Sequence, residues 1–157
     1  MDFPEPLDAN RVWFRLIRLH GIMSAAFSKR LREINLSIPQ CDVLTTLMER
    51  EGVSQQDLAE RLYVTKGNIS GLIDRLATAG LVERRTLNGD RRTHAIHLTP
   101  EGRRLGQLGL ATQRAFLADT LGRLNQEQLA QMDALFVQTS EILRKSEAAT
   151  SGDRSDR

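Results

Sequence analysis

Residues 54–79 constrain the fold most, because they predict two short helices joined by a tight turn. Ser54 and Asp57 have the spacing of a capping box, which fixes the start of the first helix. Thr65 is suited to cap the second helix, and Gly80 follows it where a left-handed C-cap belongs. The apolar residues of the second helix share one face: Ile69, Leu72, Ile73 and Leu76.

The start of this second helix is small, polar and basic: Lys66, Gly67, Asn68, Ser70 and Gly71. A helix fits the major groove of DNA only if its leading face is slim and carries hydrogen-bonding groups. The stretch therefore predicts a helix-turn-helix. A compact helical domain without a DNA partner can contain the same two helices, so the rest of the chain has to decide between these interpretations.

A change of hydrophobic period after Gly80 predicts a β-hairpin. Residues 81–86 predict one strand, residues 87–92 a turn rich in Asn, Gly and Arg, and residues 95–98 the returning strand. An isolated hairpin is marginally stable, so this one has to pack on the preceding helices. A hairpin with two arginines at its tip indicates a wing that reaches toward a second groove or a phosphate.

Long helices are predicted on both sides of this segment. The first begins at a cap on Asp8 or Asn10 and runs to about Ile34, and a second follows Ser37. Two more are expected after Thr99 and after Asn125. The first helix and these last two exceed what a winged helix needs for its own core, and their unused apolar stripes favour contact with another subunit. The alternative is that they complete a single six-helix globule.

Charge is distributed unevenly along the chain. Residues 61–104 hold nine Lys or Arg against four Asp or Glu, which is a net charge of +5. The whole chain has a net charge of +2, so the remaining residues together have a net charge of −3. A basic centre in an otherwise acidic chain indicates a polyanionic partner and argues against a winged helix used only for protein contacts. Phosphate-binding loops, nucleophile motifs and paired carboxylates are absent from the sequence, which argues against an enzyme.

A single cysteine, Cys41, excludes an intramolecular disulfide, and long apolar runs are absent. We therefore expect a soluble, cytoplasmic protein. His20, His94 and His97 do not have the spacing of a metal site, so neither a metal nor another cofactor is expected.

Seven segments together resemble the MarR family of winged-helix regulators, over about residues 10–145. In chain order they are 43–44, 58–59, 65–70 (TKGNIS), 72–76 (LIDRL), 80–84 (GLVER), 90–92 (DRR) and 98–102 (LTPEG). The resemblance implies a homodimer that binds a palindromic operator in double-stranded DNA and acts as a repressor, released by a small ligand or by oxidation.

The resemblance also assigns roles to single residues. Thr65, Lys66, Asn68 and Ser70 would meet bases and phosphates in the major groove, and Arg75 would lie toward the DNA backbone. Arg92 matches the wing arginine that enters the minor groove, Asp74 matches the acid that pairs with it, and Arg91 is a solvated turn residue or a phosphate contact. Because Arg84 and Arg85 are neighbours on a strand, at most one of them is expected to face DNA.

The effector is less constrained by the sequence. The resemblance implies a small aromatic or phenolic acid bound between the first helix and the winged lobe. The candidates there are Trp13, Arg15, Arg18, His20, Met23 and Phe27, facing Cys41 and Met48. The alternative is an ordinary dimer core with surface arginines. A second hypothesis for release is oxidation of Cys41, although a buried cysteine is usually inert.

The predicted fold class is mainly α with a small β-hairpin wing, as one structural domain. Residues 1–36 would form an N-terminal dimerisation helix and residues 37–99 the winged helix-turn-helix lobe, with the wing at about 82–98. Residues 100–145 would form C-terminal dimerisation helices, and residues 146–157 a disordered tail.

Overall fold

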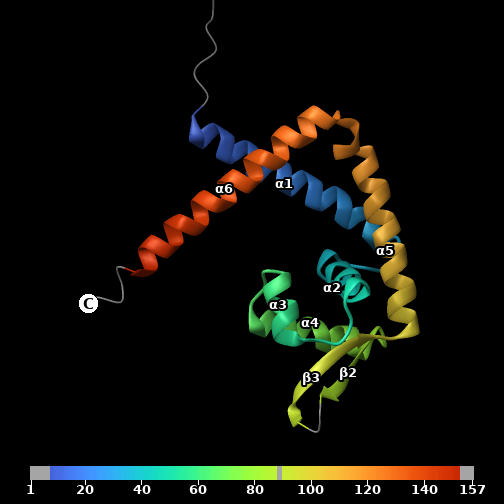
Figure 1. The fold of residues 1–157 in the computed structure, drawn as a ribbon. Helices are drawn as coiled ribbons and strands as arrows, with labels where there is room; N and C mark the ends of the chain where they lie inside the picture. Colours follow the sequence, from blue (N-terminus) through green and yellow to red (C-terminus); the bar gives the residue numbers. More distant parts are fainter. Residues whose placement is uncertain (1–7, 88–89, 153–157) are drawn as a thin grey trace, which may run out of the picture. The chain divides into compact units, whose positions relative to one another are not determined.

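A computed structural model describes residues 8–87 and 90–152, with side chains for residues 8–86 and 95–148. The elements are α1 (Ala9–Arg32), α2 (Ile38–Glu49), β1 (Val53–Ser54), α3 (Gln55–Arg61), α4 (Lys66–Thr78), β2 (Val82–Leu87), β3 (Asp90–Leu98), α5 (Pro100–Asp119), the 3-10 helix η1 (Leu121–Arg123) and α6 (Gln126–Gly152) (Figure 1). The chain forms two compact units, Met1–Arg114 and Ala115–Arg157. The mainly helical fold with a small antiparallel sheet confirms the predicted fold class.

Side-chain caps set the helix starts where the sequence predicts them. The Asp8 carboxylate accepts the backbone N–H of Arg11 at 2.7 Å, so Asp8 and not Asn10 caps α1. Ser37 and Ser54 each form a complete capping box, at the starts of α2 and α3. Thr65 caps α4 by accepting the N–H of Asn68 at 3.3 Å. These caps satisfy N–H groups that helix geometry leaves unpaired.

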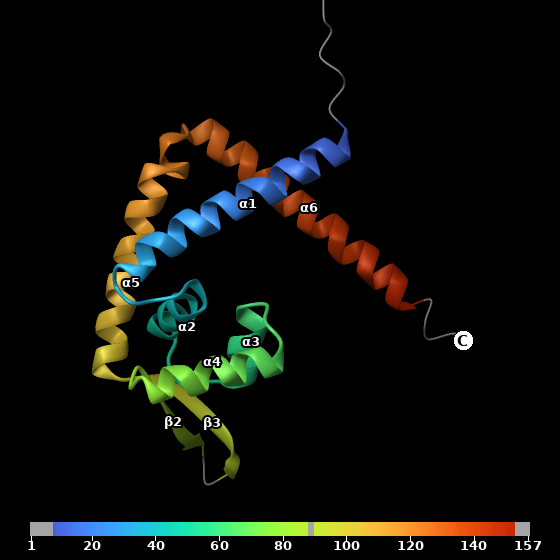
Figure 2. The same cartoon turned by 180° about the vertical axis from the view of Figure 1, so that it is seen from behind.

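The sheet has three strands, in the order β1-β3-β2, and all pairs are antiparallel. The predicted hairpin is confirmed, but β3 begins at Asp90 and not at Ala95 as expected. Strand β1 was not predicted from the sequence. In it, Val53 pairs with Ile96 and Ser54 pairs with Ala95. This two-residue strand fixes the base of the hairpin against the start of α3. Figures 1 and 2 show β2 and β3 extending past α4 as a ribbon.

One apolar core holds the winged lobe together. Among the described residues, nine apolar side chains from α1, α2, α3, α4 and β3 are completely buried: Leu31, Val43, Leu44, Leu47, Leu58, Ile69, Ile73, Leu76 and Ile96. Helix α5 approaches α2 closely at two glycines, because a Cβ on Gly106 or Gly109 would lie within 2.8 Å of the sulfur of Met48 or Cys41, respectively. The core therefore fixes α4 and the sheet relative to α2 and the first part of α5.

The second unit holds the end of α5, η1 and α6. Asn125 and Gln128 cap α6 reciprocally, at 3.0 and 2.9 Å, as the sequence predicts for Asn125. Helix α6 continues to Gly152, beyond Ser146, where the sequence predicts the start of a tail. Glu147, Ala148 and Ala149 are good helix formers, which favours continuation of the helix past Ser146. Within the described residues, no helix combines the length and apolar character needed to cross a bilayer.

Candidate nucleic-acid interface

Helix α4 has one buried and one exposed face. Ile69, Ile73 and Leu76 are fully buried and Leu72 nearly so, whereas Lys66, Gly67, Asn68 and Arg75 are exposed. Core packing therefore fixes both the position and the rotation of the helix. The polar residues predicted to meet DNA lie on the surface as a consequence of this packing, with Ser70 half-buried at its edge.

The N-terminal turn of α4 suits an anion. It begins with Lys66 and contains no acidic residue. The backbone N–H groups of a helix start carry partial positive charge, and Lys66 adds a full one. Thr65 uses its oxygen as the cap acceptor, and its hydroxyl hydrogen can still be donated outward. This turn can therefore bind phosphates, and the amide of Asn68 is exposed on it.

Arg75 lies about two turns beyond Asn68, on the same face of α4. Its guanidinium reaches back along the helix, and its Nη1 would lie 3.7 Å from a Cβ on Gly71. Gly71 thus leaves room for the side chain to run along α4 toward the N-terminal turn. This position extends the positive surface of α4 beyond Lys66, consistent with a contact to the DNA backbone.

Asp74 pairs with Arg84. The side chain of Arg92, the expected partner of Asp74, lies outside the described residues, so that pairing stays a prediction. Arg84 Nη2 donates to Asp74 Oδ1 at 2.6 Å, and Arg84 Nε donates to Gln55 Oε1 at 3.0 Å. One guanidinium therefore connects α3, α4 and β2. Arg84 was overlooked as the partner because a single sequence does not reveal which strand residue lies over Asp74.

The structure describes the side chains of some wing arginines and not of others. Arg85 is exposed and pairs with Glu83 on the same face of β2, so Arg84 and Arg85 point to opposite faces as predicted. The side chains of Arg91 and Arg92, predicted to bind phosphate and the minor groove, lie outside the described residues. Their backbone belongs to β3, and their roles stay predictions.

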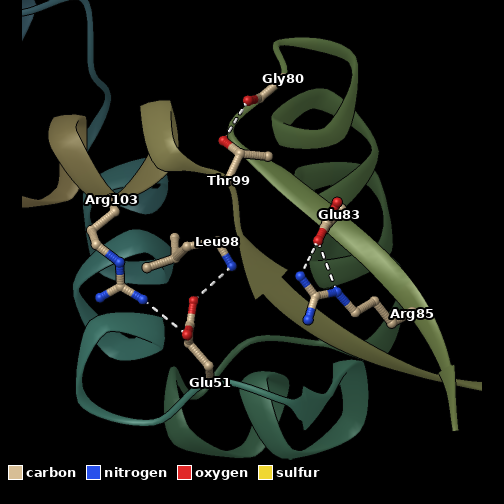
Figure 3. Close-up of polar contacts among 7 residues, drawn as sticks. All are labelled: Glu51, Gly80, Glu83, Arg85, Leu98, Thr99 and Arg103. Atoms are coloured by element: carbon tan, nitrogen blue, oxygen red, sulfur yellow. Dashed lines mark hydrogen bonds and ion pairs between the residues drawn. The ribbon is translucent and has the colours of Figure 1, made fainter.

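The base of the wing is tied to α5 by polar contacts that cross long stretches of sequence (Figure 3). Glu51 accepts the backbone N–H of Leu98 at 3.1 Å and pairs with Arg103 at 2.8 Å. Thr99 donates its hydroxyl to the carbonyl of Gly80 at 2.6 Å. Thr99 also accepts the N–H of Gly102 at 3.0 Å, which confirms it as the predicted cap of α5.

Close backbone packing adds to these contacts. A Cβ on Gly102 would overlap the carbonyl oxygen of Leu81, so only glycine fits there. The N–H of Thr99 donates to the same carbonyl at 3.1 Å. The residues after α4 and the first turn of α5 therefore form a rigid junction that we call the wing–α5 junction: Glu51, Gly80, Leu81, Leu98, Thr99, Gly102 and Arg103.

The predicted effector-site residues lie in two different environments. Trp13, Arg15, Arg18 and His20 lie exposed on α1, and Met23 is half-buried. Cys41 is buried in α2 against α5, where a Cβ on Gly109 would lie 2.8 Å from its sulfur. Phe27 and Met48 pack against the core that contains Cys41, and an effector site at this place stays a prediction.

Burial also makes Cys41 a poor nucleophile. Only 2% of its surface is exposed, and burial together with the nearby Asp42 carboxylate raises the pKa of its thiol to about 11. The thiolate is the reactive form, so its population near neutral pH is very small. Among the described residues, His, Cys, Asp and Glu side chains form no group able to hold a metal ion.

A capped recognition helix with a polar leading face, followed by a hairpin at its side, defines a winged helix-turn-helix DNA-binding protein. The chain belongs to the MarR family, whose profile matches residues 36–94. It is similar to an uncharacterized HTH-type transcriptional regulator from Bacillus cereus, with 30% identity over 125 residues, covering 77% of this chain and 83% of the relative. The chain is therefore a transcriptional regulator and not an enzyme.

Solved structures show the same fold. CouR from Rhodococcus jostii, determined bound to p-coumaroyl-CoA, is 31% identical with a TM-score of 0.71, covering 80% of this chain and 88% of that one. FabT from Streptococcus pneumoniae, determined in complex with DNA, is 21% identical with a TM-score of 0.75, covering 88% of this chain and 99% of that one.

Proposed function

We propose that this protein is a homodimeric repressor that binds a palindromic operator and is released by an aromatic acid. The exposed polar face of α4 over a fully buried apolar face carries the proposal. In this arrangement Thr65, Lys66, Asn68 and Ser70 enter the major groove, and Arg75 contacts the backbone. The wing reaches the adjoining minor groove with Arg92, where negative potential attracts a guanidinium. We expect this action in the cytoplasm.

Exposed apolar side chains support the homodimer. Seven large ones on α1 and five on α6 are 42–70% exposed: Val12, Trp13, Phe14, Leu16, Ile17, Leu19 and Ile22, and Leu135, Phe136, Val137, Ile142 and Leu143. Single apolar residues are common on surfaces, but long stripes of them mark interaction sites. A second copy of the chain is the occupant that a two-fold operator requires.

Selection from a pool of random duplexes tests the operator. A two-fold dimer presents its recognition helices about one helical turn, roughly 34 Å, apart. We therefore expect the selected sequences to contain inverted repeats with that centre-to-centre spacing. Enrichment of a single, unrepeated half-site would contradict the dimeric arrangement, and a pool without enrichment would contradict sequence-specific binding.

An aromatic acid, free or as its coenzyme A thioester, is the proposed effector. The support is CouR, which binds an aromatic thioester, and the α1 surface, where Arg15 and Arg18 accompany Trp13 and Met23. An arginine fork binds carboxylates and phosphates with two hydrogen bonds. Release of the selected operator can be titrated with p-coumaric acid and with p-coumaroyl-CoA. Failure of both compounds to release DNA would contradict this effector class and leave the DNA-binding proposal intact.

A further inference from the structure

Tyr63, in the turn between α3 and α4, has an unusual backbone conformation. Its φ is +52°, and Asn35 is the other described non-glycine residue with positive φ, at +58°. Asn tolerates this left-handed region, whereas a bulky aromatic residue there is a true outlier. Helix-turn-helix turns often use glycine instead. The chain thus carries backbone strain immediately before its recognition helix.

Packing does not explain the tyrosine. Its side chain is 96% exposed, so the ring contributes almost nothing to the apolar core. The turn itself is held by backbone bonds, from the N–H of Tyr63 to the Glu60 carbonyl at 3.3 Å and from Val64 to Ala59 at 3.0 Å. Glycine could make both bonds without strain. Strain that folding does not require is characteristic of functional sites.

The position of Tyr63 indicates what the ring can reach. It lies two residues before Thr65, the cap of α4, and beside a shallow surface groove lined by Gln56, Ala59, Glu60, Tyr63, Val64 and Lys66. The groove thus continues the surface formed by the N-terminal turn of α4. When that turn enters the major groove, residues just before it face the sugar-phosphate backbone at the groove edge.

We propose that the Tyr63 hydroxyl donates a hydrogen bond to a backbone phosphate of the bound DNA. The inference rests on the proposed entry of α4 into the major groove. A tyrosine hydroxyl is a regular donor to phosphate oxygens, and its rigid ring loses little conformational entropy on binding. Glu60, which also lines the groove, accepts a hydrogen bond from Gln56 at 3.3 Å, and Lys66 there supplies a positive charge for the phosphate.

Because a phosphate contact does not depend on sequence, a labelled mixed-sequence duplex is a sufficient probe. Affinities are measured by fluorescence anisotropy for the wild type, Tyr63→Phe and Tyr63→Gly, at several salt concentrations. We expect both variants to bind about tenfold more weakly, as for loss of a hydrogen bond to a charged group. The slope of log affinity against log salt should stay unchanged, because an uncharged donor displaces no counterion.

Three controls separate the possible outcomes. Asn35→Gly changes the other left-handed residue, in the α1–α2 turn, and should leave DNA affinity unchanged. Tyr63→Gly should melt at or above the wild-type temperature, because glycine relieves strain at this φ, so its weaker binding is not misfolding. Lys66→Ala should weaken binding and reduce the salt slope by about one.

Because the inference is a contact of the hydroxyl, wild-type affinity in either Tyr63→Phe or Tyr63→Gly would overturn it. If Lys66→Ala weakens binding while both Tyr63 variants do not, only this inference fails. If none of the three variants weakens binding, the proposed entry of α4 fails as well.

Discussion

At the scale of single residues, burial decides what Cys41 can do. Its thiol is 2% exposed and its pKa is raised to about 11, because burial disfavours the charged thiolate. We therefore expect a maleimide to leave the native protein unlabelled at neutral pH and to label it fully in denaturant. Native labelling should accelerate only as the pH rises toward 11. Rapid labelling of the native protein at neutral pH would restore oxidation of Cys41 as the release mechanism.

Lys66 and Asn68 lie two residues apart on α4 and should differ in their effects. Lys66→Ala removes a charge near phosphates, so affinity should fall alike for all sequences. Asn68→Ala removes an amide suited to adenine edges, so the operator should lose about 1–3 kcal/mol relative to a mismatched site. Competition binding between operator and mismatched duplexes measures both. Equal loss of specificity in the two variants would contradict these separate roles.

The hydrogen bonds of single side chains could be predicted from the sequence where both partners lie within a few residues of each other. The caps by Ser37, Ser54 and Thr65 depend on partners three positions away. The Arg84 contact with Gln55 spans 29 residues, and the Glu51 contact with Leu98 spans 47. Such pairs depend on the register of β2 and β3 against the helices, which hydrophobic periodicity leaves undetermined.

At the scale of elements, Arg84 couples β2 to α4 through Asp74. Its side chain is only 27% exposed, although that of Asp74 is 62% exposed. In a double-mutant cycle with Arg84→Gln and Asp74→Ala, we expect a coupling of about 0.5–1 kcal/mol in urea unfolding, because solvent screens part of the ion pair. The Glu83–Arg85 pair lies within one strand and is more exposed, so the same cycle there should give almost none.

A coupling for Asp74–Arg84 no larger than that for Glu83–Arg85 would mean that the ion pair does not hold the strand to the helix. DNA affinity gives a second readout. Arg84→Gln should weaken binding to a mixed-sequence duplex, because the wing loses a fixed position beside α4.

Gly102 shows how the wing–α5 junction depends on one missing side chain. Gly102→Ala would place a Cβ on the Leu81 carbonyl oxygen, so backbone has to shift. We expect a loss of roughly 2 kcal/mol or more in the free energy of unfolding. Gly67→Ala, in the first turn of α4 with nothing within 4 Å, should instead gain about 0.5–1 kcal/mol. Equal melting temperatures for the two variants would contradict the junction geometry.

Element types were predictable because long apolar periods and capping residues specify them. The elements whose structure differed from the prediction were short or lay at the end of the chain. Strand β1 has two residues and shares Ser54 with the cap of α3, so it leaves no pattern of its own. Beyond Ser146, the polar composition predicts a tail, but Glu147, Ala148 and Ala149 also favour helix.

At the scale of the whole molecule, the exposed apolar stripes of α1 and α6 predict a dimer. Leu143→Glu places a charge in the α6 stripe and should shift the mass measured by light scattering toward one chain. Gln138→Glu adds the same charge at an exposed polar position of the stripe's helix and should leave the mass at two chains. A monomeric wild type, or equal masses for both variants, would contradict the dimer.

The wing–α5 junction has a mechanical consequence for regulation. The start of α5 is held close to the end of β3 by the contacts of Glu51, Thr99 and Gly102. A rotation of the helix therefore rotates the strand as well. Nine residues of β3 form a lever arm of about 30 Å. A tilt of roughly 10° at its base displaces the far end by about 5 Å, more than one base-pair step of about 3.4 Å. A small reorientation of α5 would thus be enough to move the ribbon out of register with its groove.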